Sequence, residues 1–198
     1  GPPHYWDFDQ DTLKDAFDNA IGQGRMVLYD HFGSMEWQHL VAKIRYMVLH
    51  LGATHIFLDH LSIVVSGLGD GDERRMIDQA MTKLRSITEE LGIALILVSH
   101  LRRPEGRGHE EGGQTSLAQL RGSHAIGQLS DIVIGLERNQ QDEDEPNVTT
   151  LRVLKNRFSG ETGIATKLFY ERETGRLSEW SGSSVNQDDH GTMAEIPF

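Results

Sequence analysis

Two short apolar runs each end in polar residues of the types that handle phosphates and metal ions. Residues 55–58 lead into Asp59, and residues 93–98 lead into Ser99 and His100. Such runs are typical of buried strands, and ligands on parallel sheets bind at the carboxyl ends of the strands. A carboxylate at that edge can hold Mg²⁺, and an imidazole can sense a phosphate. The pattern therefore predicts a nucleotide-handling site that includes Asp59 and His100.

The elements that position these residues predict an α/β fold. Because strands and helices alternate, we expect a mostly parallel sheet flanked by helices, followed by a β-hairpin region. Glu137 and Arg138 end a third strand and are expected at the same sheet edge as Asp59. Helices are predicted at residues 9–20, 35–51 (with Ser34 as N-cap), 73–91 and near 117–129, and strands at residues 25–30, 55–59, 93–98, 131–137, 148–157, 163–170 and a short one ending at Trp180.

The composition limits the class of protein. The 198 residues carry a formal net charge of −11, which argues against a generic basic nucleic-acid coat. Cysteine is absent, which excludes disulfides and thiolate metal sites. No apolar run approaches the ~18 residues of a membrane span. The first residue is Gly1 rather than Met, which suggests a fragment or a processed chain. Residues 181–198 lack Lys and Arg and are predicted to form a disordered acidic tail, so residues 1–180 are expected to form the domain.

Five segments in order along the chain carry a family resemblance. FLDHLSIV, DERRMIDQAMTKLR, LVSHLRRP, LRGSHAIGQLSDIVIGLERNQQ and LKNRFSGETGIA resemble the RecA-like helicase half of the bifunctional primase-helicases of short-tailed phages, which are relatives of DnaB-type ring helicases. The resemblance implies a RecA-like fold and a homo-hexameric ring that hydrolyses ATP or dTTP with Mg²⁺. It also implies movement on single-stranded DNA, unwinding at the replication fork, and a location in the cytoplasm of the infected bacterial host.

The resemblance also implies roles for single residues in catalysis. Asp59 matches the Walker B acid that holds Mg²⁺, and His100 matches the γ-phosphate sensor. Gln128 matches the glutamine of the fourth helicase motif. Arg157 matches the arginine finger that reaches a neighbouring subunit's nucleotide, although an Arg at a strand end can equally be a local salt-bridge partner.

Further matches concern nucleotide binding and an accessory partner. Arg138 and Tyr170 match the residues that sandwich the base, and Lys155 belongs to the same nucleotide-binding motif as the finger. Tyr170 can equally be a packing aromatic on the hairpin. Phe198 ends the acidic tail, and a tail of this type docks the replicative DNA polymerase in the phage helicases. The alternative for the tail is simple disorder that keeps the protein soluble.

A polar, glycine-rich loop follows His100. Residues 101–116 contain four Gly and three Arg, and Arg102, Arg103 and Arg107 are candidates to contact DNA phosphates. Three glutamates in the same loop favour the alternative, a solvated loop with ordinary charges. Arg121 and Ser123, in the fourth helicase motif, are the other DNA-binding candidates.

The chain departs from the family at one essential point. It contains no G-x-x-x-x-G-K-[ST] and no Gly-Lys dipeptide, so the loop that cradles phosphates is missing. In the family that loop lies upstream, so we expect the C-terminal part of a helicase domain that is inactive alone. Two alternatives stay open: a non-catalytic module that recruits DNA polymerase through its tail, and another RecA-like ATPase such as a recombinase. The Arg121 to Gln128 motif favours the helicase.

Overall fold

The computed structural model describes residues 9–29, 37–64, 70–102, 108, 111–120 and 124–182, with the side chains of residues 63–72 left undescribed. The chain divides into two units, residues 1–33 and residues 34–198. Among the described residues no helix is both long enough and apolar enough to cross a membrane.

The first unit contains helix α1 (Gln10–Ala20). Asp9 caps it, because its Oδ2 accepts a hydrogen bond of 3.4 Å from the backbone N–H of Thr12. The helix was predicted, but the strand predicted at residues 25–30 is wrong over residues 25–29, which form a turn and an irregular segment. A strand needs a hydrogen-bonded neighbour, and the described part of this unit offers no second strand.

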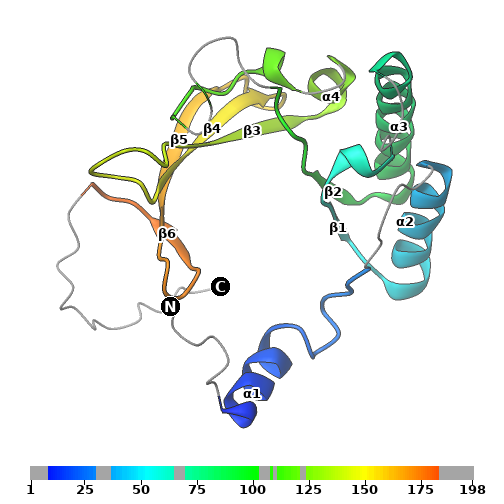
Figure 1. Ribbon diagram of the computed structural model, residues 1–198. Helices are drawn as coiled ribbons and strands as arrows, with labels where there is room; N and C mark the ends of the chain where they lie inside the picture. The colour runs from blue at the N-terminus through cyan, green and yellow to red at the C-terminus, as the bar shows by residue number, and fades with distance from the viewer. Residues whose placement is uncertain are drawn as a thin grey trace. The chain divides into compact units, whose positions relative to one another are not determined.

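The second unit begins with a parallel β-α-β arrangement (Figure 1). Helix α2 (Trp37–Leu51) precedes strand β1 (His55–Leu58), and the 3₁₀ helix η1 (Leu61–Val64) and helix α3 (Asp70–Leu91) lead to strand β2 (Ala94–Leu97). β1 and β2 pair in parallel, from His55 opposite Ala94 to Leu58 opposite Leu97. A parallel pair needs a long crossover, and α3 supplies it. The predicted helices and strands of this region are confirmed, although α3 begins three residues earlier than expected.

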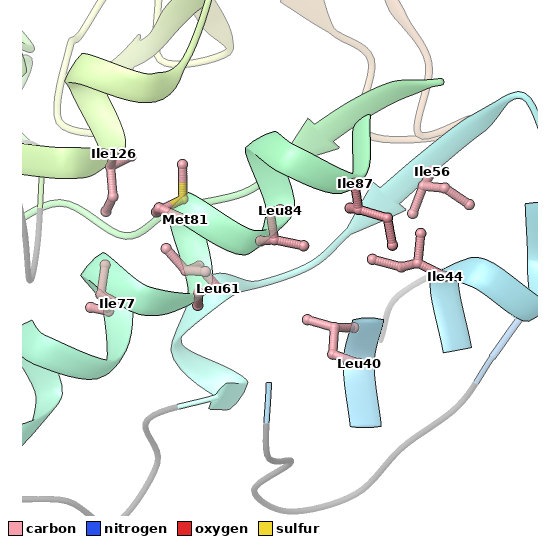
Figure 2. Packing of buried hydrophobic residues seen from close by; sticks show 10 residues of the cluster. Leu40, Ile44, Ile56, Leu61, Ile77, Met81, Leu84, Ile87 and Ile126 are labelled. Atoms are coloured by element: carbon pink, nitrogen blue, oxygen red, sulfur yellow. The ribbon is translucent and has the colours of Figure 1, made fainter. Parts of the chain in front are cut away.

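The hydrophobic core lies between these helices and β1 (Figure 2). On α3 the buried residues follow the three- and four-residue spacing of one helix face. Each of these α3 residues belongs to the apolar periodic pattern that predicted the helix. The buried cluster consists of Leu40, Ile44, Ile56, Leu61, Ile77, Ala80, Met81, Leu84, Ile87 and Ile126.

Leu84→Ala is expected to lower the free energy of unfolding by about 3 kcal/mol, because it removes buried methyl groups and leaves a cavity. Leu84 is 2% exposed, in the middle of the cluster. Urea unfolding followed by circular dichroism measures the change. Leu49→Ala is the matched control, because Leu49 is 64% exposed. Equal losses in the two variants would contradict this placement of the core.

The remainder of the second unit is an antiparallel sheet. After the 3₁₀ helix η2 (Leu117–Gln119) and helix α4 (His124–Leu129), the strands β3 (Ile132–Arg138), β4 (Val148–Asn156), β5 (Gly163–Tyr170) and β6 (Leu177–Glu179) pair in chain order. The single helix predicted near residues 117–129 is therefore two separate helices, with residues 121–123 outside the described part. The α/β class and the hairpin of β4 and β5 are confirmed.

Strand β3 differs from the prediction in its partner. It was expected as a third parallel strand, but it pairs antiparallel with β4, from Ile132 opposite Asn156 to Arg138 opposite Thr149. The connection between them is the short acidic turn at residues 139–147, and short connections join antiparallel neighbours. Parallel pairing among the described strands is limited to β1 and β2.

Candidate functional site

Asp59 and His100 lie at the same end of the parallel strand pair. Beyond the last paired residues, the N–H of Val98 donates to the carbonyl of Leu58 at 2.9 Å. The ring of His60, which follows Asp59, meets the ring of His100 edge to face, with 4.3 Å between the ring centroids. The structure thus brings together the strand ends that the sequence singled out, with both Asp59 and His100 exposed.

The Asp59 carboxylate fits one mode of Mg²⁺ binding. Among the described residues no group of three or more His, Asp and Glu side chains is placed to hold a metal ion. Mg²⁺ in nucleotide sites is usually held by one or two carboxylates together with substrate phosphates and waters, rather than by an all-protein cage. A single exposed carboxylate at a strand end is compatible with that arrangement.

Arg157 follows β4 and contacts Asp131, the residue before β3. Its backbone N–H donates to the Asp131 carbonyl at 2.8 Å, and its Nη1 lies 3.3 Å from Asp131 Oδ1. The Arg157 side chain is nevertheless 62% exposed. The local ion pair considered from the sequence is therefore present, and the outer part of the guanidinium remains accessible to solvent.

Lys155 contacts its own chain. Its Nζ donates to the carbonyls of Gly127 at 2.8 Å, Gln128 at 3.0 Å and Ser130 at 2.8 Å. These bonds use all three ammonium protons and satisfy carbonyls at the C-terminal end of α4, which no later helical turn can pair. The arrangement favours a capping role for Lys155, and its predicted contact with nucleotide stays a prediction.

Gln128 lines an open, polar hollow between α3 and α4 with a volume of about 500 Å³. It stands on α4, not at the strand ends with Asp59 and His100. The residues around the hollow that can form hydrogen bonds are Arg74, Asp78, Thr82, His124 and Gln128.

Arg138 and Tyr170, the predicted base-binding pair, lie against each other. The Arg138 guanidinium carbon lies 5.6 Å from the centroid of the Tyr170 ring. Arg138 Nε donates to the carbonyl of Pro146 and Nη2 donates to Asn147 Oδ1, each at 2.8 Å. A base stacked on both faces needs about 6.8 Å, twice the stacking distance of a nucleic-acid strand. A base can therefore enter only if one of the two side chains moves outward.

The polar loop after β2 is attached at its described ends. Leu101 forms an isolated β-bridge with Leu120, and the N–H of Arg102 donates to the carbonyl of Gln119 at 2.7 Å. The Arg102 side chain is exposed. The other DNA-binding candidates, Arg103, Arg107, Arg121 and Ser123, lie outside the described residues, and so does Phe198.

A polar network at the end of this loop, which includes the buried Thr115, was not predicted from the sequence. Thr115, only 2% exposed, donates its N–H and its Oγ1 to Glu137 Oε1, each at 2.8 Å. Arg152 on β4 donates to the same carboxylate from Nε at 2.7 Å and from Nη2 at 3.1 Å. A Cβ on Gly135 would lie 2.1 Å from Thr115 Oγ1, so the glycine makes room for this contact. Glu137 therefore anchors the loop, and its predicted place at the ligand edge with Asp59 is wrong, because β3 belongs to the other sheet.

Glu137→Gln is expected to lower the free energy of unfolding at pH 7 by about 3 kcal/mol, because it leaves the partly buried Arg152 without its counter-charge. Burial raises the pKa of Glu137, but the hydrogen bonds from Arg152 and Thr115 outweigh it and hold that pKa below its usual value. The stabilisation is thus complete above the ordinary carboxyl pKa and is lost as the pH falls through the lower, folded-state pKa. Urea unfolding at pH 7 and at lower pH should show the difference between wild type and variant shrinking in acid.

The control for that experiment is Glu90→Gln. Glu90 accepts two hydrogen bonds of 2.6 Å from Arg45, but its side chain is 50% exposed, so solvent screens the ion pair and the loss should be much smaller than for Glu137→Gln. A pH-independent difference for Glu137→Gln would contradict the assignment of an ionised, partly buried carboxylate.

The chain has two parallel strands joined by a helix, and an exposed carboxylate and an imidazole follow their carboxyl ends. These features place it in the class of α/β proteins that bind ligands at that edge of the sheet. Comparison with known proteins narrows this class. Residues 7–179 match the DnaB-like helicase C terminal domain, and the chain therefore belongs to that family.

Curated relatives agree with this family. The chain is 47% identical over 175 residues to the DNA helicase/primase of Enterobacteria phage T3, a match that covers 87% of this chain and 31% of the phage protein. It is 30% identical over 89 residues to the replicative DNA helicase DnaB of Treponema pallidum (strain Nichols), covering 45% of this chain and 19% of that protein. The chain thus spans about a third or less of the length of these relatives.

Solved structures support the fold. A DnaB-like replicative helicase, solved in a study of its interactions with primase, matches with a TM-score of 0.69 and 20% identity over 88% of this chain and 43% of that one. A second structure, of an ATPase domain, matches with a TM-score of 0.64 and 22% identity over 86% of this chain and 61% of that one. The RecA-like fold expected from the sequence is confirmed.

Proposed function

We propose that this chain is part of an NTP-dependent replicative DNA helicase that unwinds duplex DNA by moving along single-stranded DNA at the phage replication fork. The observation that carries the proposal is the 47% identity to a phage helicase/primase over most of the chain. Residues 1–180 form the C-terminal part of the ATPase domain, and residues 181–198 form a tail. The protein works in the cytoplasm of the infected bacterial host.

The proposed chemistry is hydrolysis of ATP or dTTP between subunits of a homo-hexamer. When Mg²⁺ is bound, it neutralises charge on the transferring phosphoryl group. Asp59 holds that ion, and His100 senses the γ-phosphate from the neighbouring strand end. Their support is the convergence of the two residues at the end of β1 and β2. Arg157 acts on the nucleotide of an adjacent subunit, and Gln128 takes part in catalysis as the glutamine of the fourth helicase motif.

The proposed contacts with nucleotide base and DNA come from other elements. Arg138 and Tyr170 hold the base after one of the two side chains moves outward, and the support is that they lie side by side at the ends of β3 and β5. Lys155 contributes to the nucleotide site if its amine leaves the end of α4. Single-stranded DNA is contacted by the two polar segments on either side of η2. Their residues are Arg102, Arg103, Arg107, Arg121 and Ser123.

The proposed partner of the tail is the replicative DNA polymerase. The support is the composition of the tail, in which Asp188, Asp189 and Glu195 precede a terminal aromatic, Phe198.

The test compares this chain with one extended upstream through a G-x-x-x-x-G-K-[ST] segment. NTP hydrolysis is measured for both, with and without single-stranded DNA. We expect hydrolysis, and its stimulation by DNA, only in the extended protein, because the phosphate cradle is needed for catalysis. Hydrolysis by the shorter chain alone would contradict the assignment, and inactivity of both would favour the binding module.

A further inference from the structure

Asp131 joins three elements of the second unit through one carboxylate. It stands between α4 and β3, and its Oδ2 accepts a hydrogen bond from Nη1 of Arg85 on α3. Its Oδ1 faces Arg157, which follows β4, at 3.3 Å. α3 and α4 pack against each other, as Figure 1 shows, so Asp131 lies where the helical layer meets the antiparallel sheet. Neither Asp131 nor Arg85 is among the site residues predicted from the sequence.

The backbone and the side chain of Arg157 are held separately. The backbone N–H of Arg157 donates to the Asp131 carbonyl at 2.8 Å, and this bond does not depend on either side chain. The guanidinium is held only at Nη1 by Asp131 Oδ1 among the contacts of the described residues, and it is 62% exposed. Asp131 can therefore set the direction of the guanidinium without fixing the strand end.

The Asp131 carboxylate also offsets the repulsion between Arg85 and Arg157. Two guanidinium groups approach one carboxylate whose side chain is 32% exposed, with Arg85 28% exposed. Without the negative charge, Arg85 and Arg157 would repel each other at close range in a partly shielded setting. Arg85 would keep its other partner, Glu89, at 2.9 Å, so the repulsion would displace the more exposed Arg157. The hydrogen bond from Arg85, followed by that from Arg157, lowers the pKa of Asp131, so the carboxylate is ionised at neutral pH.

We propose that Asp131 is the positioning residue of Arg157, holding the guanidinium in the direction from which it reaches the nucleotide of a neighbouring subunit and tying it to α3. This inference rests on the proposed function, in which Arg157 acts between subunits. The 3.3 Å contact is the looser of the two that Asp131 makes, so a phosphate oxygen can replace it while Arg85 still neutralises the carboxylate.

The test is carried out in the upstream-extended protein assembled on single-stranded DNA. Asp131→Asn keeps the shape and the backbone bond but removes the charge. We expect kcat for NTP hydrolysis to fall on the order of tenfold to hundredfold, because a small misplacement of a catalytic group has that effect, while KM changes by less than about twofold. Asp131→Glu, which restores the charge, should recover most of kcat. Glu89→Gln, which removes only the other partner of Arg85, should retain wild-type kcat.

A double-variant comparison separates positioning from general stability. With Arg157→Ala already present, Asp131→Asn should cause no further loss of kcat, because the side chain it positions is gone. A further loss in the double variant, comparable to that of the single one, would overturn the proposal in favour of a structural role. A wild-type kcat for Asp131→Asn beside an inactive Arg157→Ala would overturn it while leaving the proposed function standing. A wild-type kcat for Arg157→Ala would overturn the finger assignment itself and the proposal with it.

Discussion

Arg157→Ala is expected to abolish DNA-stimulated NTP hydrolysis in the assembled, upstream-extended protein while leaving nucleotide binding nearly intact. An arginine supplied by a neighbouring subunit stabilises the charge that develops in phosphoryl transfer, and such residues contribute on the order of 10³–10⁵ in rate. The exposed guanidinium after β4 is suited to that role, because it can reach beyond its own subunit. The measurements are kcat for hydrolysis and the Kd of a non-hydrolysable nucleotide.

The control is Arg176→Ala. Arg176 is an exposed residue just before β6, and its backbone N–H and carbonyl form hydrogen bonds that alanine keeps. It should show wild-type kcat. Mixing Arg157→Ala subunits with Asp59→Asn subunits offers a sharper criterion, because some interfaces of a mixed ring combine an intact Asp59 with an intact Arg157. Partial recovery of hydrolysis on mixing is expected only if Arg157 acts between subunits. Undiminished turnover in Arg157→Ala rings would reject the finger.

Asp59→Asn is expected to reduce hydrolysis in the same protein on the order of 10³-fold, because a metal ion contributes several kcal/mol of charge stabilisation in phosphoryl transfer. Asparagine has nearly the same shape but lacks the negative charge that attracts Mg²⁺. The Mg²⁺ concentration needed for half-maximal hydrolysis should rise together with the fall in kcat. A titration of hydrolysis rate against Mg²⁺ measures both quantities.

Asp144→Asn is the matched control for Asp59→Asn. Asp144 is an exposed carboxylate in the acidic turn between β3 and β4, and its backbone N–H donates to Asp142 Oδ1, a bond that asparagine keeps. Its loss should leave the Mg²⁺ dependence unchanged. An Asp59→Asn protein with wild-type kcat and an unchanged Mg²⁺ requirement would show that the metal is held elsewhere.

Local patterns were sufficient for much of the fold. The periodicity of α2 and α3 and the apolar runs of β1 and β2 are set by neighbouring residues, so they could be read directly. The hairpin of β4 and β5 was predictable for the same reason, because a short turn joins its strands. The segment at residues 25–29 has the composition of a strand but lacks one in the structure, because strand formation depends on a pairing partner.

Within the candidate site, the amino-acid sequence alone was enough to place Asp59 and His100 together, since the carboxyl ends of adjacent parallel strands must meet. Arg138 and Tyr170 were matched through the family resemblance, and their contact joins the ends of β3 and β5, which β4 separates in the sheet. Tertiary structure alone revealed the Thr115 network, the capping by Lys155 and the position of Asp131 between Arg85 and Arg157. Those contacts join residues 15 to 46 positions apart. Hydrogen bonds and ion pairs over such separations depend on which elements pack together, and no local propensity or periodicity encodes that choice.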